Sequence, residues 1–173
     1  MLRSMLLSDL DMVLAWRNDL TVRQYMYNQH EIRIDEHEEW FIESSNSKNI
    51  HLLIFEIETR GLGFIQFKII EEINRIGEWG FYLSPQAPPG TGSVLGQDGL
   101  SYAFQDLKLQ RLYGKAIVFN QKSIKFHKKL GFSFQDTLKE HFFDGKKNHD
   151  VIVFSLFNEG WINSEIGKGF GKF

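Results

Sequence analysis

The feature that most constrains the fold is a single dense cluster of proline and glycine, residues 85–92, which contains all three prolines of the chain. An apolar run, residues 76–84, precedes it. After it, apolar side chains recur at helical spacing at Leu100, Ala103, Phe104 and Leu107. Because proline and glycine interrupt regular structure, this pattern predicts a strand, a tight loop and then a helix over residues 93–107.

The remaining patterns predict an α/β domain with a mixed sheet. One helix is expected over residues 8–18, and a second begins at Asp35 with Glu38 completing a capping box. The later elements are strands over residues 51–57, 64–70, 111–119, 132–138 and 150–157, turns over 60–63 and 144–147, and a helix over 121–130 that ends at Gly131. We expect one domain over residues 1–157 and a tail of unassigned role over 158–173.

Composition excludes several classes of protein. The formal net charge of −2 provides no basic surface for nucleic acid, and the absence of cysteine excludes disulfides, thiolate zinc sites and a cysteine nucleophile. No stretch approaches eighteen apolar residues, and the first eleven residues lack the apolar run of a signal peptide. We therefore expect a cytoplasmic chain without a membrane span.

The loop contains the first candidate binding segment, Pro88-Pro89-Gly90-Thr91-Gly92-Ser93. Glycine lets a backbone turn sharply and approach a ligand closely. The amides at the start of the following helix favour an anion such as a pyrophosphate. An ordinary strand–helix connection explains the same residues, and the spacing matches neither a Walker loop nor a dinucleotide fingerprint.

A second candidate segment begins at Asn120, which is expected to end a strand and cap a short helix. The segment reads Asn120-Gln121-Lys122-Ser123-Ile124-Lys125-Phe126-His127-Lys128-Lys129-Leu130-Gly131-Phe132. On its own it is only a capped amphipathic helix. Its motif resembles the C-terminal half of the acetyl-CoA fold in the GNAT superfamily of N-acetyltransferases, and the earlier Gly-x-Gly resembles that family's pyrophosphate loop.

The resemblance implies a GNAT fold, with a mixed, mostly antiparallel sheet flanked by helices, and acetyl-CoA as co-substrate. It implies that the pyrophosphate lies against the amides of Gly90, Thr91, Gly92 and Ser93. It further implies that Asn120 touches the pantetheine arm and that the backbone N–H near Leu83 polarises the thioester carbonyl. The family's usual general acid, a tyrosine, is His127 here, and a frequent Gln or Arg before the loop is Ala87.

Glu78 is the candidate general base. It lies in the apolar segment 77–83, where alternation places Glu78, Gly80 and Tyr82 on one face. A carboxylate there is costly to bury without a partner or a function, and amine acetylation requires a base. Pairing with an Arg or Lys of a neighbouring strand explains Glu78 equally well, whereas the resemblance favours the catalytic role.

The N-terminal region is where GNAT proteins form the acceptor site. Three side chains of this region could bind the phosphate or sugar groups of an acceptor: Arg17, Arg23 and His37. Four others could contact a nucleobase or the apolar face of a sugar: Tyr25, Met26, Phe41 and, from the later strand, Tyr82. Trp16 and Trp40 are expected in the core.

Within the superfamily the motifs resemble enzymes that acetylate the 4-amine of a UDP-linked amino-dideoxy sugar, in pathways of the pseudaminic-acid type that serve flagellin glycosylation. Two other classes stay open: a GNAT enzyme acting on a protein N-terminus or a polyamine, and a non-catalytic module that binds CoA. The prediction includes a small-molecule acceptor and no metal, nucleic acid or membrane partner. The oligomeric state is open, a homodimer included.

Overall fold

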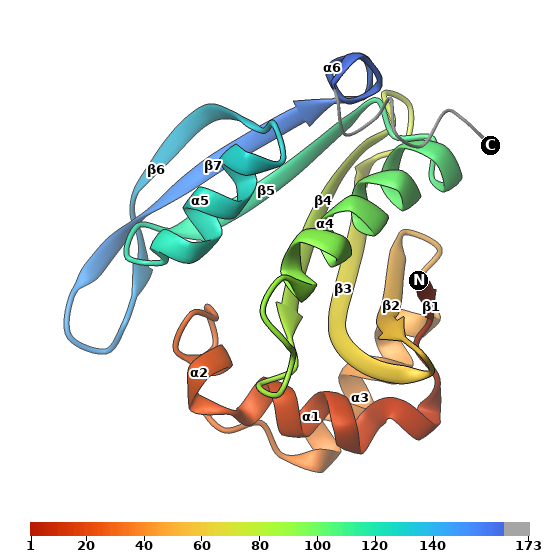
Figure 1. Ribbon diagram of the computed structural model, residues 1–173. Coiled ribbons are helices and arrows are strands. Elements are labelled where there is room, and N and C mark those ends of the chain that lie inside the picture. The colour runs from red at the N-terminus through yellow and green to blue at the C-terminus, as the bar shows by residue number, and fades with distance from the viewer. Residues whose placement is uncertain (165–173) are drawn as a thin grey trace. The chain divides into compact units, whose positions relative to one another are not determined.

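The computed structural model describes residues 1–164, and their strands form one mixed sheet of seven strands in the order β1-β2-β3-β4-β5-β7-β6 (Figure 1). The strands are β1 (Leu2–Ser4), β2 (Ile50–Ile57), β3 (Arg60–Glu71), β4 (Ile76–Leu83), β5 (Arg111–Ile117), β6 (Ser133–Phe143) and β7 (Asn148–Phe157). Strands β4 and β5 pair in parallel, whereas the pairs β1–β2, β2–β3, β5–β7 and β6–β7 are antiparallel. This is the expected mixed, mostly antiparallel sheet.

Helices account for most of the remaining described residues. They are the 3₁₀ turn η1 (Leu7–Asp9), α1 (Leu10–Asn18), α2 (Leu20–Arg23), α3 (Ile34–Ser45), α4 (Thr91–Ser101), the π-helical turn η2 (Tyr102–Asp106), α5 (Gln121–Lys129) and α6 (Asn158–Asn163). Within the described residues, no helix has the length and apolar character needed to cross a membrane.

The chain divides into two compact units. The first contains Met1–Lys68 and Gly80–Leu95, and the second contains Ile69–Trp79 and the described residues from Gly96 onward. The divisions fall inside β3, β4 and α4, so the units share these elements. The sequence predicted one domain over residues 1–157.

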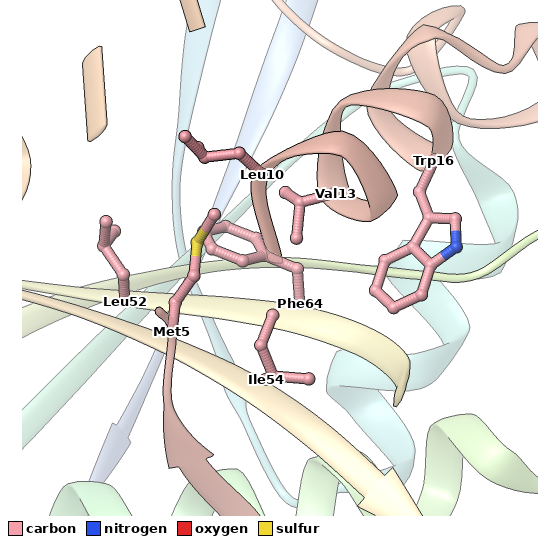
Figure 2. Close-up of a cluster of buried hydrophobic side chains, with 7 residues drawn as sticks. All are labelled: Met5, Leu10, Val13, Trp16, Leu52, Ile54 and Phe64. Atoms are coloured by element: carbon pink, nitrogen blue, oxygen red, sulfur yellow. The ribbon is translucent and has the colours of Figure 1, made fainter. Parts of the chain in front are cut away.

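The core of the first unit lies between α1 and the strands β2 and β3, as Figure 2 shows. Its buried side chains are Met5, Leu10, Val13, Trp16, Leu52, Ile54 and Phe64. Leu10 and Val13 share one face of α1, and Leu52 and Ile54 share one face of β2, as helical and strand periodicity require. Trp16 lies in the core as expected, and Trp40 packs against it.

The turn between β2 and β3 lies two residues earlier than predicted. It is formed by Glu58 and Thr59, both at positive φ (50° and 66°), and Ile57 pairs directly with Arg60. The prediction placed the turn at residues 60–63 because of their two glycines. Instead, Gly63 lies inside β3, where a Cβ atom would come within 2.7 Å of Leu95 Cδ1. This glycine permits close packing rather than a turn.

The predicted capping box of α3 is not formed. The helix begins at Ile34 after an extended Arg33, and it has no side-chain cap. Asp35 instead pairs with Arg33, with distances of 3.0 and 2.7 Å to the guanidinium nitrogens. The sequence patterns also missed the short elements β1, α2 and α6, and α6 falls within the expected tail, where it buries Trp161.

In the second unit, β6 and β7 form a long hairpin whose turn contains Gly145 at φ +90°, as predicted (Figure 1). Helix α5 ends before Gly131, whose φ of +88° fits the predicted glycine cap. The predicted helix over 93–107 is α4 followed by the π-helical turn η2. In the middle of α4, a Cβ on Gly96 would lie 2.7 Å from Phe126 Cζ, so this glycine lets α5 pack closely against α4.

Candidate active site

The predicted pyrophosphate loop enters α4 through a sharp turn in the first unit. Gly90 has φ +94°, a conformation that favours glycine, and α4 begins at Thr91. The Thr91 hydroxyl and amide both donate to the Pro88 carbonyl, at 2.7 and 3.2 Å, and the Ser93 amide donates to the Gly90 carbonyl at 2.9 Å. Two of the four predicted amides therefore already have a partner within the loop. Gly92 occupies the first turn of the helix, where the dipole favours an anion.

Asn120 caps α5 in the second unit. Its side-chain oxygen accepts a hydrogen bond from the Ser123 amide at 3.1 Å, and its own amide donates to the Ile117 carbonyl at 2.8 Å. The capping prediction is confirmed. The cap occupies the side-chain oxygen, and the backbone carbonyl accepts from the Ile124 amide at 3.1 Å, so a contact with pantetheine would use the side-chain NH₂ group.

Leu83 is the last residue of β4, and the chain leaves the strand there. The next amide, that of Ser84, donates to the Leu62 carbonyl at 2.9 Å, and Ser84 is buried. This hydrogen bond to β3 fixes the backbone where the chain leaves β4. The role of the Leu83 amide at the thioester stays a prediction.

Glu78 forms an ion pair across the parallel strands of the second unit. Its Oε2 lies 2.7 Å from Lys115 Nζ, and the exposed fractions of the two side chains are 32% and 31%. Glu78 lies opposite Tyr113 in the β4–β5 register. This is the pairing with a neighbouring strand that the sequence left open, and about a third of the Glu78 side chain is exposed.

His127 is almost completely buried in the second unit, with 1% of its surface exposed. Its Nε2 lies 3.1 Å from the indole nitrogen of Trp79, and its Nδ1 lies 2.8 Å from the carbonyl oxygen of Ser123. The ring stacks on Phe154 with 5.1 Å between centroids. Burial lowers the pKa of His127 to about 4. The role of proton donor that the resemblance implies for His127 stays a prediction.

Arg17, on α1 in the first unit, is held by one hydrogen bond and carries an unpaired nitrogen. Its Nη2 donates to the Asn28 carbonyl at 2.6 Å, whereas its Nη1 is buried and has no hydrogen-bond partner within residues 1–164. Burial lowers the pKa of Arg17 from its ordinary value. An arginine donor that is removed from water without an acceptor is costly, so this group suits a bound oxygen atom.

His37, on α3, has a comparable unpaired atom. It is 4% exposed, it stacks on Trp40, and its Nε2 has no partner within the described residues. Burial lowers the pKa of His37. A hydrogen bond to the backbone of Leu10 has the opposite, smaller effect, because it favours the charged form of the ring. We infer that this backbone group is a carbonyl that accepts from the Nδ1, which leaves a lone pair on the Nε2.

The four predicted apolar contacts of the acceptor are partly buried in the first unit. Phe41 and Tyr82 pack against the core of Figure 2, and the Tyr82 ring lies 5.2 Å from that of Phe64. Burial raises the pKa of the Tyr82 hydroxyl above its usual range, and the charge of Arg17 opposes this rise. Tyr25 and Met26 follow α2, with amides bonded to the carbonyls of Val22 and Arg23.

The positive charge of Arg17 lowers the pKa of both Tyr82 and His37 in the first unit, against the larger effect of burial on Tyr82. In the second unit, Glu78 directly precedes the tryptophan that binds His127. Sequence reasoning missed the partners Asn28, Lys115 and Trp79. It had no local signal for the last two, because they lie 37 and 48 residues from the groups they bind.

Residues 1–133 match the Acetyltransferase (GNAT) domain family, and the chain belongs to this family of N-acetyltransferases. Acetyl-CoA is the typical co-substrate of such enzymes. No group of three or more His, Asp or Glu side chains in the described part of the chain is arranged to hold a metal ion.

Three known proteins illustrate the similarity. Acetyltransferase PseH of Campylobacter jejuni is 30% identical over 140 residues, 78% of this chain and 83% of its own. Spermidine N(1)-acetyltransferase of Escherichia coli is 25% identical over 169 residues, 93% of this chain and 87% of its own. A crystal structure of Vibrio cholerae spermidine N-acetyltransferase with CoA and spermine aligns with a TM-score of 0.87 at 22% identity, and the alignment covers 94% of this chain and 98% of that one.

Proposed function

We propose that this acetyltransferase moves the acetyl group of acetyl-CoA to the 4-amine of a UDP-linked amino-dideoxy sugar. The observation that supports this most directly is the unpaired, buried Nη1 of Arg17. Guanidinium has five N–H donors and no acceptor, and its planar fork matches phosphate oxygens. A diphosphate bound there supplies the acceptor that Arg17 lacks.

His37 supports the same class of acceptor through complementary chemistry. Its buried Nε2 carries a lone pair and has no described partner, so it can accept a hydrogen bond from a hydroxyl or an N–H group. A nucleotide sugar contains both kinds of group. Arg17 and His37 together therefore provide one donor and one acceptor for a polar, anionic ligand.

The aromatic rings of Tyr25, Phe41 and Tyr82 and the thioether of Met26 could contact the apolar parts of such a ligand. A nucleobase and a deoxy sugar have flat or apolar faces that aromatic and methionine side chains cover well. Tyr25, Met26, Phe41 and Tyr82 belong to the same unit as Arg17 and His37. We propose that these side chains contact the base and the sugar.

A polyamine is the second candidate, favoured by the spermidine acetyltransferases among the related proteins. A polycation requires carboxylates, and several acidic side chains of this region are already engaged by bases. Glu36 lies 3.0 Å from His30, Asp35 lies 2.7 Å from Arg33, and Glu31 lies 3.7 Å from Arg23. A buried arginine also repels a polyamine. Glu38 and Glu39 of the same region keep the polyamine open as an acceptor, whereas the paired carboxylates and Arg17 favour the nucleotide sugar.

In the proposed reaction the sugar ammonium first loses a proton to Glu78. The free amine then forms a C–N bond with the thioester carbonyl carbon, and the C–S bond breaks with its electron pair staying on sulfur. The nitrogen releases its second proton to solvent as the amide forms. We propose that the Gly92 segment binds the pyrophosphate, that Asn120 contacts pantetheine, and that the Leu83 amide polarises the carbonyl. No acyl-enzyme intermediate on cysteine can form, because the chain has none.

Turnover of acetyl-CoA with a panel of UDP-4-amino sugars, spermidine, spermine and peptides with free N-termini tests this function. We expect a UDP-4-amino sugar to give the highest kcat/KM. Faster turnover of a polyamine or a peptide than of any UDP-sugar would contradict the substrate assignment. Lack of turnover with every amine would favour a non-catalytic module that binds CoA.

Replacing Arg17 with alanine should raise the KM for the sugar nucleotide and leave the KM for acetyl-CoA nearly unchanged. A hydrogen bond to a charged group contributes about 1.5–3 kcal/mol, which predicts an increase of roughly 10- to 150-fold. Arg33→Ala is the matched control, because Arg33 is exposed and pairs only locally with Asp35. Steady-state kinetics measure both constants, and a change confined to acetyl-CoA would contradict the role of Arg17.

A further inference from the structure

We propose that His127 is a positioning residue that holds the indole of Trp79, the neighbour of Glu78 on β4, and does not donate the proton to the leaving thiolate. This inference concerns the acetyl transfer itself and holds for any acceptor amine. It rests on the geometry of α5, β4, β5 and β7 within the second unit.

The hydrogen bonds of the imidazole to the Trp79 indole and to the Ser123 carbonyl define its tautomer, and the Ser123 hydroxyl lies farther from Nδ1, at 3.4 Å. The indole nitrogen of Trp79 can only donate, so the His127 Nε2, 3.1 Å away, must present a lone pair. The carbonyl oxygen of Ser123 can only accept, so the Nδ1, 2.8 Å away, must carry the hydrogen. The single proton of the neutral ring therefore points at the helix that carries the ring.

The surroundings of the ring oppose a second proton. Phe154 of β7 stacks on it, Phe126 of α5 and Phe132 meet it edge-on, and Trp79 faces it from β4. None of these side chains carries a charge. Protonation of Nε2 would also set an N–H group against the indole N–H. The lowered pKa of His127, about 4, agrees with this geometry, and at neutral pH the ring has no proton to give to a thiolate.

Gly114 on β5 leaves room for the bond between His127 and Trp79. A Cβ atom at this position would lie 2.2 Å from His127 Nε2 and 2.8 Å from the indole nitrogen. Both distances are far below a normal contact, so any larger residue would displace one of the two rings. The close approach of the β5 backbone thus places the imidazole and the indole in one arrangement.

Acetyl transfer does not require His127 as a general acid. When the amine attacks, the C–S bond breaks and sulfur leaves as a thiolate that takes its proton from water. Thiols are far stronger acids than alcohols or water, and the cysteine thiol, for example, ionises near pH 8.5, so a thiolate is a competent leaving group. The proton lost by the amine passes to the base and then to solvent.

Two substitutions separate positioning from acid catalysis. In His127→Gln the carboxamide oxygen can accept the Trp79 N–H near the place of Nε2, and a carboxamide cannot act as a general acid. We expect this variant to retain kcat and the shape of its pH profile. In His127→Phe the ring is kept and the acceptor is lost, so kcat and Tm should both fall. Loss of a general acid lowers a rate by about 10²–10⁴, and a fall of that size in folded His127→Gln would overturn the proposal.

Nitrogen-15 NMR of the wild-type imidazole gives a readout that needs neither a variant nor a substrate. Between about pH 6 and 9, where an ordinary histidine loses its charge, we expect an unprotonated Nε2 and a protonated Nδ1 throughout. A proton on Nε2 in this range would overturn the proposal even if no sugar nucleotide turns over. Retention of the tautomer would support it whatever the acceptor proves to be.

Discussion

Glu78→Gln is expected to lower kcat at neutral pH by about 10²–10⁴-fold, the usual effect of removing a general base. An ammonium cannot attack a thioester, and glutamine keeps the shape of Glu78 without accepting the proton. The defect should shrink as the pH rises, because the amine then loses its proton to solvent unaided. A pH profile of kcat for the variant and the wild type measures both effects.

Lys115→Met is the matched control for this prediction, since it removes the partner of Glu78 and keeps the carboxylate. Both side chains of the pair are about one-third exposed, and such pairs contribute roughly 0–1 kcal/mol to stability. We expect a much smaller loss of kcat in Lys115→Met than in Glu78→Gln. Equal losses in the two variants, or wild-type kcat in Glu78→Gln, would mean that Glu78 serves only the ion pair.

Gly92→Asp is expected to weaken acetyl-CoA binding severely while the protein stays folded. An aspartate is favourable in the first turn of α4 because of the helix dipole, but its charge would repel a pyrophosphate. Two unit charges 4 Å apart interact by about 1–4 kcal/mol at the surface of a protein, which corresponds to a rise in Kd of roughly 5- to 1,000-fold. Calorimetry with acetyl-CoA measures the change.

The control for Gly92→Asp is Gly92→Asn, which adds a side chain of the same size without the charge. The difference between the two variants isolates electrostatic repulsion from steric interference. Normal affinity in a folded Gly92→Asp protein would show that the pyrophosphate does not bind at this loop. Thermal unfolding of both variants establishes that they are folded.

The parts of the fold and site that the sequence predicted are those encoded within a few residues. The loop before α4, the Asn120 cap and the glycine after α5 each depend on neighbouring residues and on backbone conformations that only some residue types favour. Strand and helix periodicity likewise identified the core faces of α1 and β2. Such features need no knowledge of the tertiary structure.

The features that the sequence did not predict depend on contacts between residues that are distant in the chain. Gly63 resembled a turn residue, but its function is to admit Leu95 from α4. Lys115 became the partner of Glu78 only through the parallel register of β4 and β5, which no local pattern specifies. A helix start at Asp35 was favoured by its propensity for caps, yet Arg33 pairs with that carboxylate and the helix begins earlier.

The case of His127 shows how position in a motif and environment can give different answers. The motif places a histidine where a tyrosine usually acts as an acid, which suggests the same role. Its chemistry is set by Trp79, 48 residues away, and by the apolar rings around it. A sequence motif identifies which helix position faces inward, but the protonation state comes from the packed neighbours.

The turn at Glu58 and Thr59 has a consequence for how the β2–β3 hairpin finds its alignment. A two-residue turn with both residues at positive φ is the usual hairpin connection, but it is favourable mainly for Asn and Gly. Glutamate and threonine make it unfavourable, and threonine especially so because it is β-branched. The turn therefore contributes little to the choice of register. Cross-strand apolar pairs, such as Leu53 with Ile65 and Ile54 with Phe64, define the alignment of the two strands instead.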